Sequence, residues 1–288
     1  MLLGNFEIVA IRAGTYWWDG GAVFGVVPKT LWGKRFQSDE LNRIEQGFNC
    51  YLIRTGERTI LIETGLGDKR DERARERMRV AAQTESIAQT LARHGIDPES
   101  VDTVIDSHLH WDHCSGNTIV RNGRAEPVLP RAQYFASRGE WEHAHERLIR
   151  DGVSYLDENY DPLVASGRMT LVDGDFEVAP GVWMRRAPGH NRDMMVVTAE
   201  SGGNTFCFLS DLVPTHAHLQ PSWVSAFDLY PLQAIETKTV WLSRAAERRW
   251  ICAFAHDPSV DFARIEPVAQ TSRSALSFQA IPLPRDTG

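Results

Sequence analysis

Four side chains of types that commonly bind metal ions lie within six residues, shortly after an apolar run at residues 101–105. They are His108, His110, Asp112 and His113. In an extended chain the side chains at positions i and i+2 point to the same side, so His108 and His110 can bind one ion together. A turn after Trp111 would direct Asp112 and His113 toward a second ion. The alternative is a polar loop whose histidines only satisfy buried backbone groups, and the density of ligand types disfavours it.

The segment at residues 108–113 has the form HxHxDH and resembles the signature of the metallo-β-lactamase superfamily. Three later segments are similar to other motifs of that family: a Pro-Gly-His turn at residues 187–190, a strand-end aspartate at residues 209–211 and a late histidine at residues 255–257. The resemblance covers about residues 6 to 270. It implies an α/β fold, a four-layer αββα sandwich, in which residues 1–288 form a single domain with the metals at the sheet edge.

The resemblance also implies two metal sites and assigns their ligands by position. The first site would be formed by His108, His110 and His190. The second would be formed by Asp112, His113 and His256. Asp211 would bridge the ions together with a hydroxide that acts as the nucleophile, and Asp112 could also pass a proton to the leaving group. Imidazole and carboxylate ligands without thiolate suit zinc, iron, manganese or cobalt, and we expect two divalent ions, with zinc first.

Some neighbours of this ligand set depart from the family pattern. Glu63 stands where the family often has aspartate. We expect its carboxylate to orient a ligand histidine, and the alternative is an ordinary strand-end charge. The frequent GHxxGH form is reduced to residues 189–193, which contain one histidine. Cys114 follows the HxHxDH segment, but the four cysteines lie far apart without a CxxC motif, so we expect reduced, packed thiols.

Five histidines lie outside the ligand set. His94 precedes a glycine at the end of a predicted helix, where it would cap the helix. His143 and His145 have the HxH spacing but fall on a predicted helix, where side chains at i and i+2 diverge by roughly 200°. We expect both to be surface residues. His216 and His218 closely follow the bridging aspartate, and contact with substrate is as plausible for them as an ordinary loop role.

Two aromatic stretches, residues 16–32 and 223–230, suggest a pocket. We expect them to form an apolar lid and wall for a substrate with a hydrophobic part, and Trp223 is a candidate substrate contact. A dimer contact or simple core filling is the alternative. Residues 14–47 are accordingly predicted to be an N-terminal lid or a dimer segment, and a homodimer is the expected assembly.

Segments 24–32, 211–216 and 227–231 are similar to the quorum-quenching lactonase-like branch of the superfamily. That branch also includes relatives active on aryl esters and organophosphates. Some acyl-homoserine lactone lactonases have a tyrosine three residues after the bridging aspartate, and here that position is Pro214. The metals, with His216 or His218, would then have to stabilise a developing oxyanion.

The predicted elements that position these residues alternate between short apolar strands and a few helices. Strands are predicted at residues 6–11, 49–53, 59–62, 101–105, 133–136, 169–172, 182–185, 195–198, 205–209 and 250–255. Helices are predicted at 84–94, after a capping box formed by Ser137 and Glu140, and from Pro231, with Leu232, Ile235, Leu242 and Ala246 on one face. The charged region 68–79 should be a solvated helix or loop.

Composition excludes several classes. The chain has 288 residues, 42% of them hydrophobic, and a net charge of −7, which excludes intrinsic disorder and disfavours nucleic-acid partners. We expect no membrane partner, and the absence of an apparent leader predicts a cytoplasmic protein. The leading hypothesis is a dinuclear metal hydrolase of lactones or esters. Alternatives are an organophosphate or aryl esterase, a glyoxalase-type thioesterase, a β-lactamase, or a metal-binding regulatory protein without turnover.

Overall fold

Residues 1–268 and 276–284, which the computed structural model describes, form two seven-stranded sheets and a two-stranded one. The first sheet has the spatial order β1 (Leu2–Leu3), β2 (Phe6–Asp19), β3 (Arg43–Arg54), β4 (Thr59–Ile62), β5 (Thr103–Ile105), β8 (Gln133–Ser137), β9 (Met169–Val172). The second has the order β10 (Phe176–Ala179), β11 (Val182–Arg186), β12 (Met195–Ser201), β13 (Asn204–Phe208), β14 (Ile251–Ala253), β15 (Ala263–Pro267), β16 (Phe278–Pro282). The small sheet pairs β6 (Thr118–Arg121) with β7 (Arg124–Pro127).

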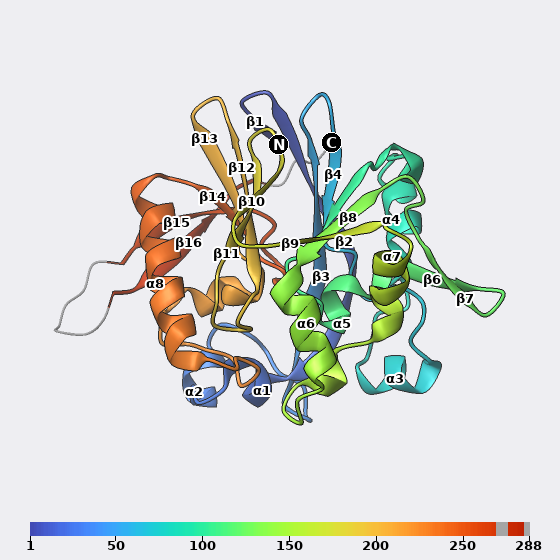
Figure 1. The fold of residues 1–288 in the computed structure, drawn as a ribbon. Coiled ribbons are helices and arrows are strands. Elements are labelled where there is room, and N and C mark those ends of the chain that lie inside the picture. Colours follow the sequence, from blue (N-terminus) through green and yellow to red (C-terminus); the bar gives the residue numbers. More distant parts are fainter. Residues whose placement is uncertain (269–275, 285–288) are drawn as a thin grey trace.

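Helices cover the outer face of each large sheet (Figure 1). The helix α8 (Pro231–Glu247) lies on the second sheet, whereas α4 (Ile87–Arg93), α6 (Arg138–Glu146) and α7 (Asp161–Ala165) lie on the first. The shorter helices are α1 (Gly20–Phe24), α2 (Lys29–Trp32), α3 (Glu72–Arg77) and α5 (Trp111–Cys114). The predicted four-layer αββα sandwich is therefore confirmed.

Strand periodicity explains why the sheets stack. In β4, Ile60 and Ile62 are buried between the two sheets, while Leu61 packs under the helices of the first sheet. In β13, Phe206 and Phe208 face the inter-sheet core, while Cys207 packs beneath the helix of the second sheet. Because successive strand side chains point to opposite faces, an apolar run of this kind is buried on both sides.

The predicted strands all form, with shifted ends, but several strands were missed. The β6–β7 hairpin turns at Asn122 and Gly123, which have φ of 52° and 74°. Asn-Gly is the preferred pair for such a turn, so this signal was present in the sequence. The strands β1, β10, β15 and β16 were also missed, being short or at the sheet edges.

The helices confirm three predicted segments but correct two details. The predicted capping box at Ser137 is wrong, because that residue makes no side-chain cap bond and Glu140 turns inward; the capping box of the structure joins Ser86 and Gln89 at the start of α4. The predicted apolar face of α8 is confirmed at Leu242 and Ala246, which pack on the core, and is wrong at Leu232, which is 76% exposed. The buried side of the helix is formed by Ala234, Lys238, Trp241, Leu242 and Ala245.

Two further predictions can be compared with the structure. All four cysteines are buried and free, as expected. The charged region forms α3 and its flanking loops. Among the described residues, no helix combines the length and the apolar character needed to cross a bilayer.

Candidate metal centre

The HxHxDH segment follows β5, an interior strand of the first sheet, and precedes the hairpin β6–β7. His110 has extended backbone (φ −65°, ψ 150°), and the rings of His108 and His110 lie 4.6 Å apart between centroids. The helix α5 begins directly afterwards and reverses the direction in which Asp112 and His113 project. The expected turn after the HxH pair is therefore present.

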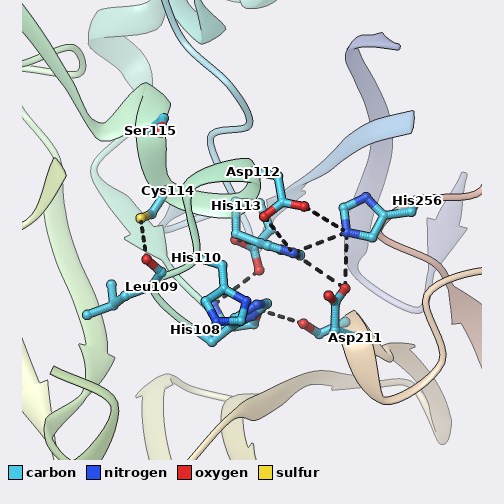
Figure 2. A network of polar contacts seen from close by, with 12 residues as sticks. His108, Leu109, His110, Asp112, His113, Cys114, Ser115, Asp211 and His256 are labelled. Atoms are coloured by element: carbon cyan, nitrogen blue, oxygen red, sulfur yellow. Dashed lines mark hydrogen bonds and ion pairs between the residues drawn. The ribbon is translucent and has the colours of Figure 1, made fainter. Parts of the chain in front are cut away.

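The structure brings all seven predicted ligands together. They form three overlapping groups of atoms that could hold an ion: His108, His110, His190; His108, His113, Asp211; and Asp112, His113, His256. Figure 2 shows the side chains of His113, His256, Asp112 and Asp211 directed toward one another. Since Asp211 comes from the loop after β13 and His256 from the loop after β14, the edges of both sheets contribute to the cluster.

The distances within this cluster are those of groups that share a cation. The Nε2 atoms of His113 and His256 lie 3.2 Å apart, and His190 Nε2 lies 3.2 Å from His110 Nδ1. His108 Nε2 and Asp211 Oδ1 are buried without a hydrogen bond, although Asp211 Oδ1 faces the imidazoles of His113 and His256 at ion-pair distance. Since buried polar atoms are normally satisfied, these orphaned atoms fit one or more divalent ions bound by nitrogen and oxygen ligands.

The electrostatics of the cluster agree with this assignment. Burial, reinforced by the neighbouring histidines, lowers the pKa of His108 and His110 well below the usual value, which leaves neutral imidazoles able to bind metal. Burial opposes ionisation of Asp211, but the facing imidazoles of His113 and His256 hold its pKa well below the ordinary range. A bound divalent cation would stabilise the ionised carboxylate of Asp211 in place of positively charged imidazoles.

The outer nitrogens of His190 and His256 meet orienting groups. Asp228 Oδ1 lies 3.0 Å from His190 Nδ1, and the carbonyl of Gly47 accepts from His256 Nδ1 at 2.9 Å. Such contacts fix the tautomer and orientation of metal-binding histidines. Glu63 Oε2 lies 3.6 Å from His113 Nδ1, beyond hydrogen-bond distance, while its Oε1 accepts from Ser107 N at 3.1 Å, so its expected role toward a ligand histidine stays a prediction.

Positive backbone angles occur at two residues beside the cluster. Glu63 has φ of 62°, and Ser210, directly before Asp211, has φ of 48°. Residues other than glycine rarely adopt this conformation, and structures retain it where it positions functional side chains.

Glu140 is a site residue that the sequence reasoning assigned to a capping box. It is fully buried, and its Oε1 accepts from Leu109 N at 3.2 Å and from Tyr155 Oη at 2.7 Å. Burial raises the pKa of Glu140. Since Leu109 lies between His108 and His110, this carboxylate holds the HxH backbone from inside the protein.

A cavity of about 930 Å³ opens beside the cluster. Its walls include candidate ligands and apolar side chains, among them His110, Asp112, His190, Asp211, His256, Trp17, Trp18, Met78, Trp111 and Phe227. The predicted aromatic wall at Trp17 and Trp18 is thus present. Residues 14–47 also contribute to the cavity wall, and most of those that do lie on the paired ends of β2 and β3.

Tyr16 provides a phenol where the sequence offered no obvious donor. Its ring stacks on Phe48 with centroids 4.4 Å apart, and its hydroxyl donates to Asp112 Oδ2 at 3.2 Å. Burial, followed by the charges of Asp112 and Asp211, raises its pKa well above the usual value, so the phenol keeps its proton. The signal in the sequence was its place in the first aromatic stretch.

The candidate substrate contacts lie elsewhere. His216 Nδ1 bonds Asp257 Oδ2 at 2.5 Å, and His218 is fully buried, with Nδ1 2.8 Å from Thr215 Oγ1. Trp223 packs edge-on against Phe24. These three residues do not line this cavity, and their contact with substrate stays a prediction.

The expectation for His143 is corrected. Its side chain is 3% exposed, and its Nε2 lies 2.7 Å from Asp151 Oδ2. His145 is partly exposed and lies 3.1 Å from Asp161, as its position on the outer side of α6 allows. The prediction of a surface residue therefore holds for His145 and is wrong for His143.

The chain is similar to known proteins in the region that contains the candidate ligands. Residues 47–256 match the model of the metallo-beta-lactamase superfamily. A curated N-acyl homoserine lactonase of Bacillus cereus is 30% identical over 165 residues, which is 53% of this chain and 59% of the relative. The chain thus spans about three fifths of the length of the curated relatives that it matches.

Solved structures extend the similarity over nearly the whole chain. A probable metal-dependent hydrolase from Staphylococcus aureus is 31% identical, with a TM-score of 0.85 over 92% of this chain and 94% of the other. AidC, described as a dizinc quorum-quenching lactonase, has a TM-score of 0.79 over 99% of this chain and 97% of its own, at 19% identity. The second likeness supports the fold.

Proposed function

The chain belongs to the metallo-β-lactamase superfamily, and on that premise we propose that it is a metal-dependent hydrolase that opens lactones or cleaves related esters. The observation that carries this proposal is the convergence of two histidine groups on Asp211 beside a cavity. The curated relatives are named N-acyl homoserine lactonases, which supports a lactone or ester substrate.

We propose two ions for each chain. Asp211 Oδ1 lies 3.1 Å from His256 Nε2, while Oδ2 lies 3.5 Å from His190 Nε2. A carboxylate that offers one oxygen to each histidine group suits a dinuclear site. When bound, such ions supply Lewis-acid stabilisation of a carbonyl oxygen and an activated water. Zinc fits the nitrogen and oxygen ligands, and iron, manganese and cobalt are the alternatives.

Two side chains of this protein would handle protons and charge around the reacting bond. Tyr16 retains its proton and can donate a hydrogen bond to an oxygen on which negative charge develops. Asp112 lines the same cavity beside the phenol and could carry a proton to the leaving group. We propose that Tyr16, on β2, takes the role that was expected for His216 or His218.

The cavity wall supports a substrate with an apolar part. Trp17, Trp18 and Met78 lie along it, and burying each methylene group there would be worth about 0.8 kcal/mol. Aryl esters and phosphotriesters remain second candidates, because the same aromatic side chains could pack against an aryl group. The expected homodimer and the absence of nucleic-acid and membrane partners stay predictions.

The test combines metal titration with hydrolysis assays on lactones, aryl esters, phosphotriesters, thioesters and β-lactams. We expect activity to saturate at two equivalents, and kcat/KM for lactones to rise with acyl length. Full activity at one equivalent would contradict the dinuclear site. Saturated metal binding without turnover of any substrate would instead indicate a metal-binding regulatory protein.

A second test concerns the phenol. Tyr16→Phe should lower kcat by about 10²-fold with KM little changed, since it removes one donor to developing charge. Tyr160→Phe is the matched control, because Tyr160 is buried against Asp157 away from the cavity. An unchanged kcat in Tyr16→Phe, at full metal content, would exclude the phenol from charge stabilisation.

A further inference from the structure

Four arginines line the cavity, and their charges meet different surroundings. Arg43 is paired with Asp39 at 2.8 Å. Arg77 and Arg150 are exposed to solvent. Arg70 is half-buried, and among the described residues the carboxylates of Asp112, Glu158 and Asp71 act on its charge without forming an ion pair with it. Arg70 is therefore the arginine on this wall whose charge is neither paired nor fully hydrated.

The guanidinium of Arg70 is held in place by an aromatic ring. Its Cζ lies 5.0 Å from the centre of the Trp111 ring, and its Nε is shielded from solvent without a hydrogen-bond acceptor. A shielded donor without an acceptor is costly, and a stacked guanidinium still offers several N–H groups in one plane. An anion in the cavity would accept from the terminal N–H groups of this guanidinium, because the shielded Nε cannot be reached from the cavity.

The position of Arg70 relative to the reacting groups constrains the ligand. The Trp111 ring that Arg70 covers also lies 5.9 Å from the ring of Tyr16, whose hydroxyl contacts Asp112. Arg70 and Tyr16 therefore contact the same ring on one cavity wall, and the charge of Asp112 acts on both side chains. Since the candidate metal ligands and Tyr16 already surround the reacting bond, a group bound by Arg70 would be a different part of the same substrate.

We propose that Arg70 binds an oxyanion, a carboxylate or a phosphate, carried by the substrate at a distance from the bond that is cleaved. This inference deepens the proposed hydrolase function and rests on it. The substrate class is then an amphipathic lactone or ester with an apolar stem and an anionic end. Because the whole protein has a net charge of −7, long-range attraction does not favour such a substrate, and a local contact must provide the preference.

The decisive experiment uses substrates that differ only in that anion. Mono-p-nitrophenyl suberate, its methyl ester and the corresponding ω-phosphonate all release p-nitrophenolate from the same bond. In Arg70→Met, kcat/KM for the anionic substrates should fall by about 10- to 100-fold, while the methyl ester changes less than about twofold. If the wild type has the higher kcat/KM for the carboxylate substrate, the anionic end is a carboxylate; if it has the higher value for the phosphonate substrate, the anionic end is a phosphate.

Arg77→Met is the matched control, because it removes the same charge from the same cavity at an exposed position. An equal loss of kcat/KM for the anionic substrates in both variants would mean that the two charges act only through long-range electrostatics. An equal loss of kcat/KM for all three substrates in Arg70→Met would mean that the substitution disturbs the structure of the site. Either result overturns the inference. Arg70→Lys should restore part of the preference, since it keeps the charge without the planar donors.

A binding measurement separates this inference from the proposed function. Calorimetry on the metal-loaded protein would compare N-butyl suberamic acid with the corresponding primary amide, neither of which contains an ester bond. The acid should bind the wild type about 10-fold more tightly, and Arg70→Met should abolish this difference. A preference retained in Arg70→Met would place the carboxylate at the metal centre and overturn the inference, even if no ester were cleaved.

Discussion

The pair His108 and His110 and the pair His143 and His145 have the same spacing but different backbone conformations. The first pair follows a strand in extended chain, and its rings lie 4.6 Å apart, facing His190. The second pair lies on α6, where positions i and i+2 point in different directions. His143 accordingly meets Asp151 inside the protein, while His145 meets Asp161 at the surface.

A third pair extends this comparison. His216 and His218 lie on a short 3₁₀ helix, and their rings turn away from each other, toward Asp257 and toward the carbonyl of Val23. HxH spacing therefore permits joint metal binding but does not require it. The backbone conformation, and the nearest carboxylate or carbonyl, decide what each imidazole does.

The largest difference in turnover and metal content should appear between variants of the ligand histidines and a variant of the pair on α6. His110→Ala and His190→Ala should lower turnover by at least about 10³-fold, reduce the metal content and lower the Tm, because metal binding stabilises the folded state. His145→Ala should retain the wild-type metal content. Elemental analysis and calorimetric unfolding provide the measurements, and full metal content in His110→Ala would remove this residue from the ligand set.

The third pair predicts a pH effect. Burial lowers the pKa of His218 to about 3. In the unfolded chain the imidazole of His218 would take up a proton near pH 6.5. The contribution of neutral His218 to the free energy of unfolding is therefore fully present above that pH and is lost as the pH falls toward 3. The loss should reach at most about 1.4 kcal/mol for each pH unit. Unfolding by denaturant between pH 7 and 4 should show a shallower pH dependence in His218→Gln; an identical slope would contradict the assignment.

The sequence predicted those parts of the fold and site that leave a local signal. Strand periodicity at residues 59–62 and 169–172 matched β4 and β9, and the dense HxHxDH segment led to the ligand cluster. Asp228 and Tyr16 gave no comparable signal, because their partners His190 and Asp112 lie 38 and 96 residues away. Only the folded sheets bring such residues together.

Glu140 shows a different limit. Its spacing from Ser137 suits a capping box as well as any helix start, but the burial of this helix face places the carboxylate against Leu109 instead. The same burial explains His143, whose helical position is compatible with either a solvated or a buried side chain. Local spacing predicted the helix, and tertiary packing determined which of its polar residues are internal.

His143→Ala should be destabilising without affecting the metal. The substitution leaves the carboxylate of Asp151, which is 7% exposed, without its imidazole partner, and should lower the free energy of unfolding by about 1–3 kcal/mol. His143→Gln, which can still donate a hydrogen bond, should recover part of this loss. Metal content and denaturant midpoints would check the prediction, and an unchanged midpoint would mean that the contact contributes nothing.

The smallest effect is expected for His145→Ala. Although partial burial opposes it, the carbonyl of Trp141 and the carboxylate of Asp161 raise the pKa of His145 above its usual value. Its contribution is therefore fully present below about pH 6.5 and is lost as the pH rises through the pKa of the folded state. Because the pair is largely exposed, the loss should stay within about 0.5 kcal/mol at pH 6 and vanish at pH 9. A loss of similar size at both pH values would show that the ring contributes through its packing on Trp141, 4.4 Å away, rather than through its charge.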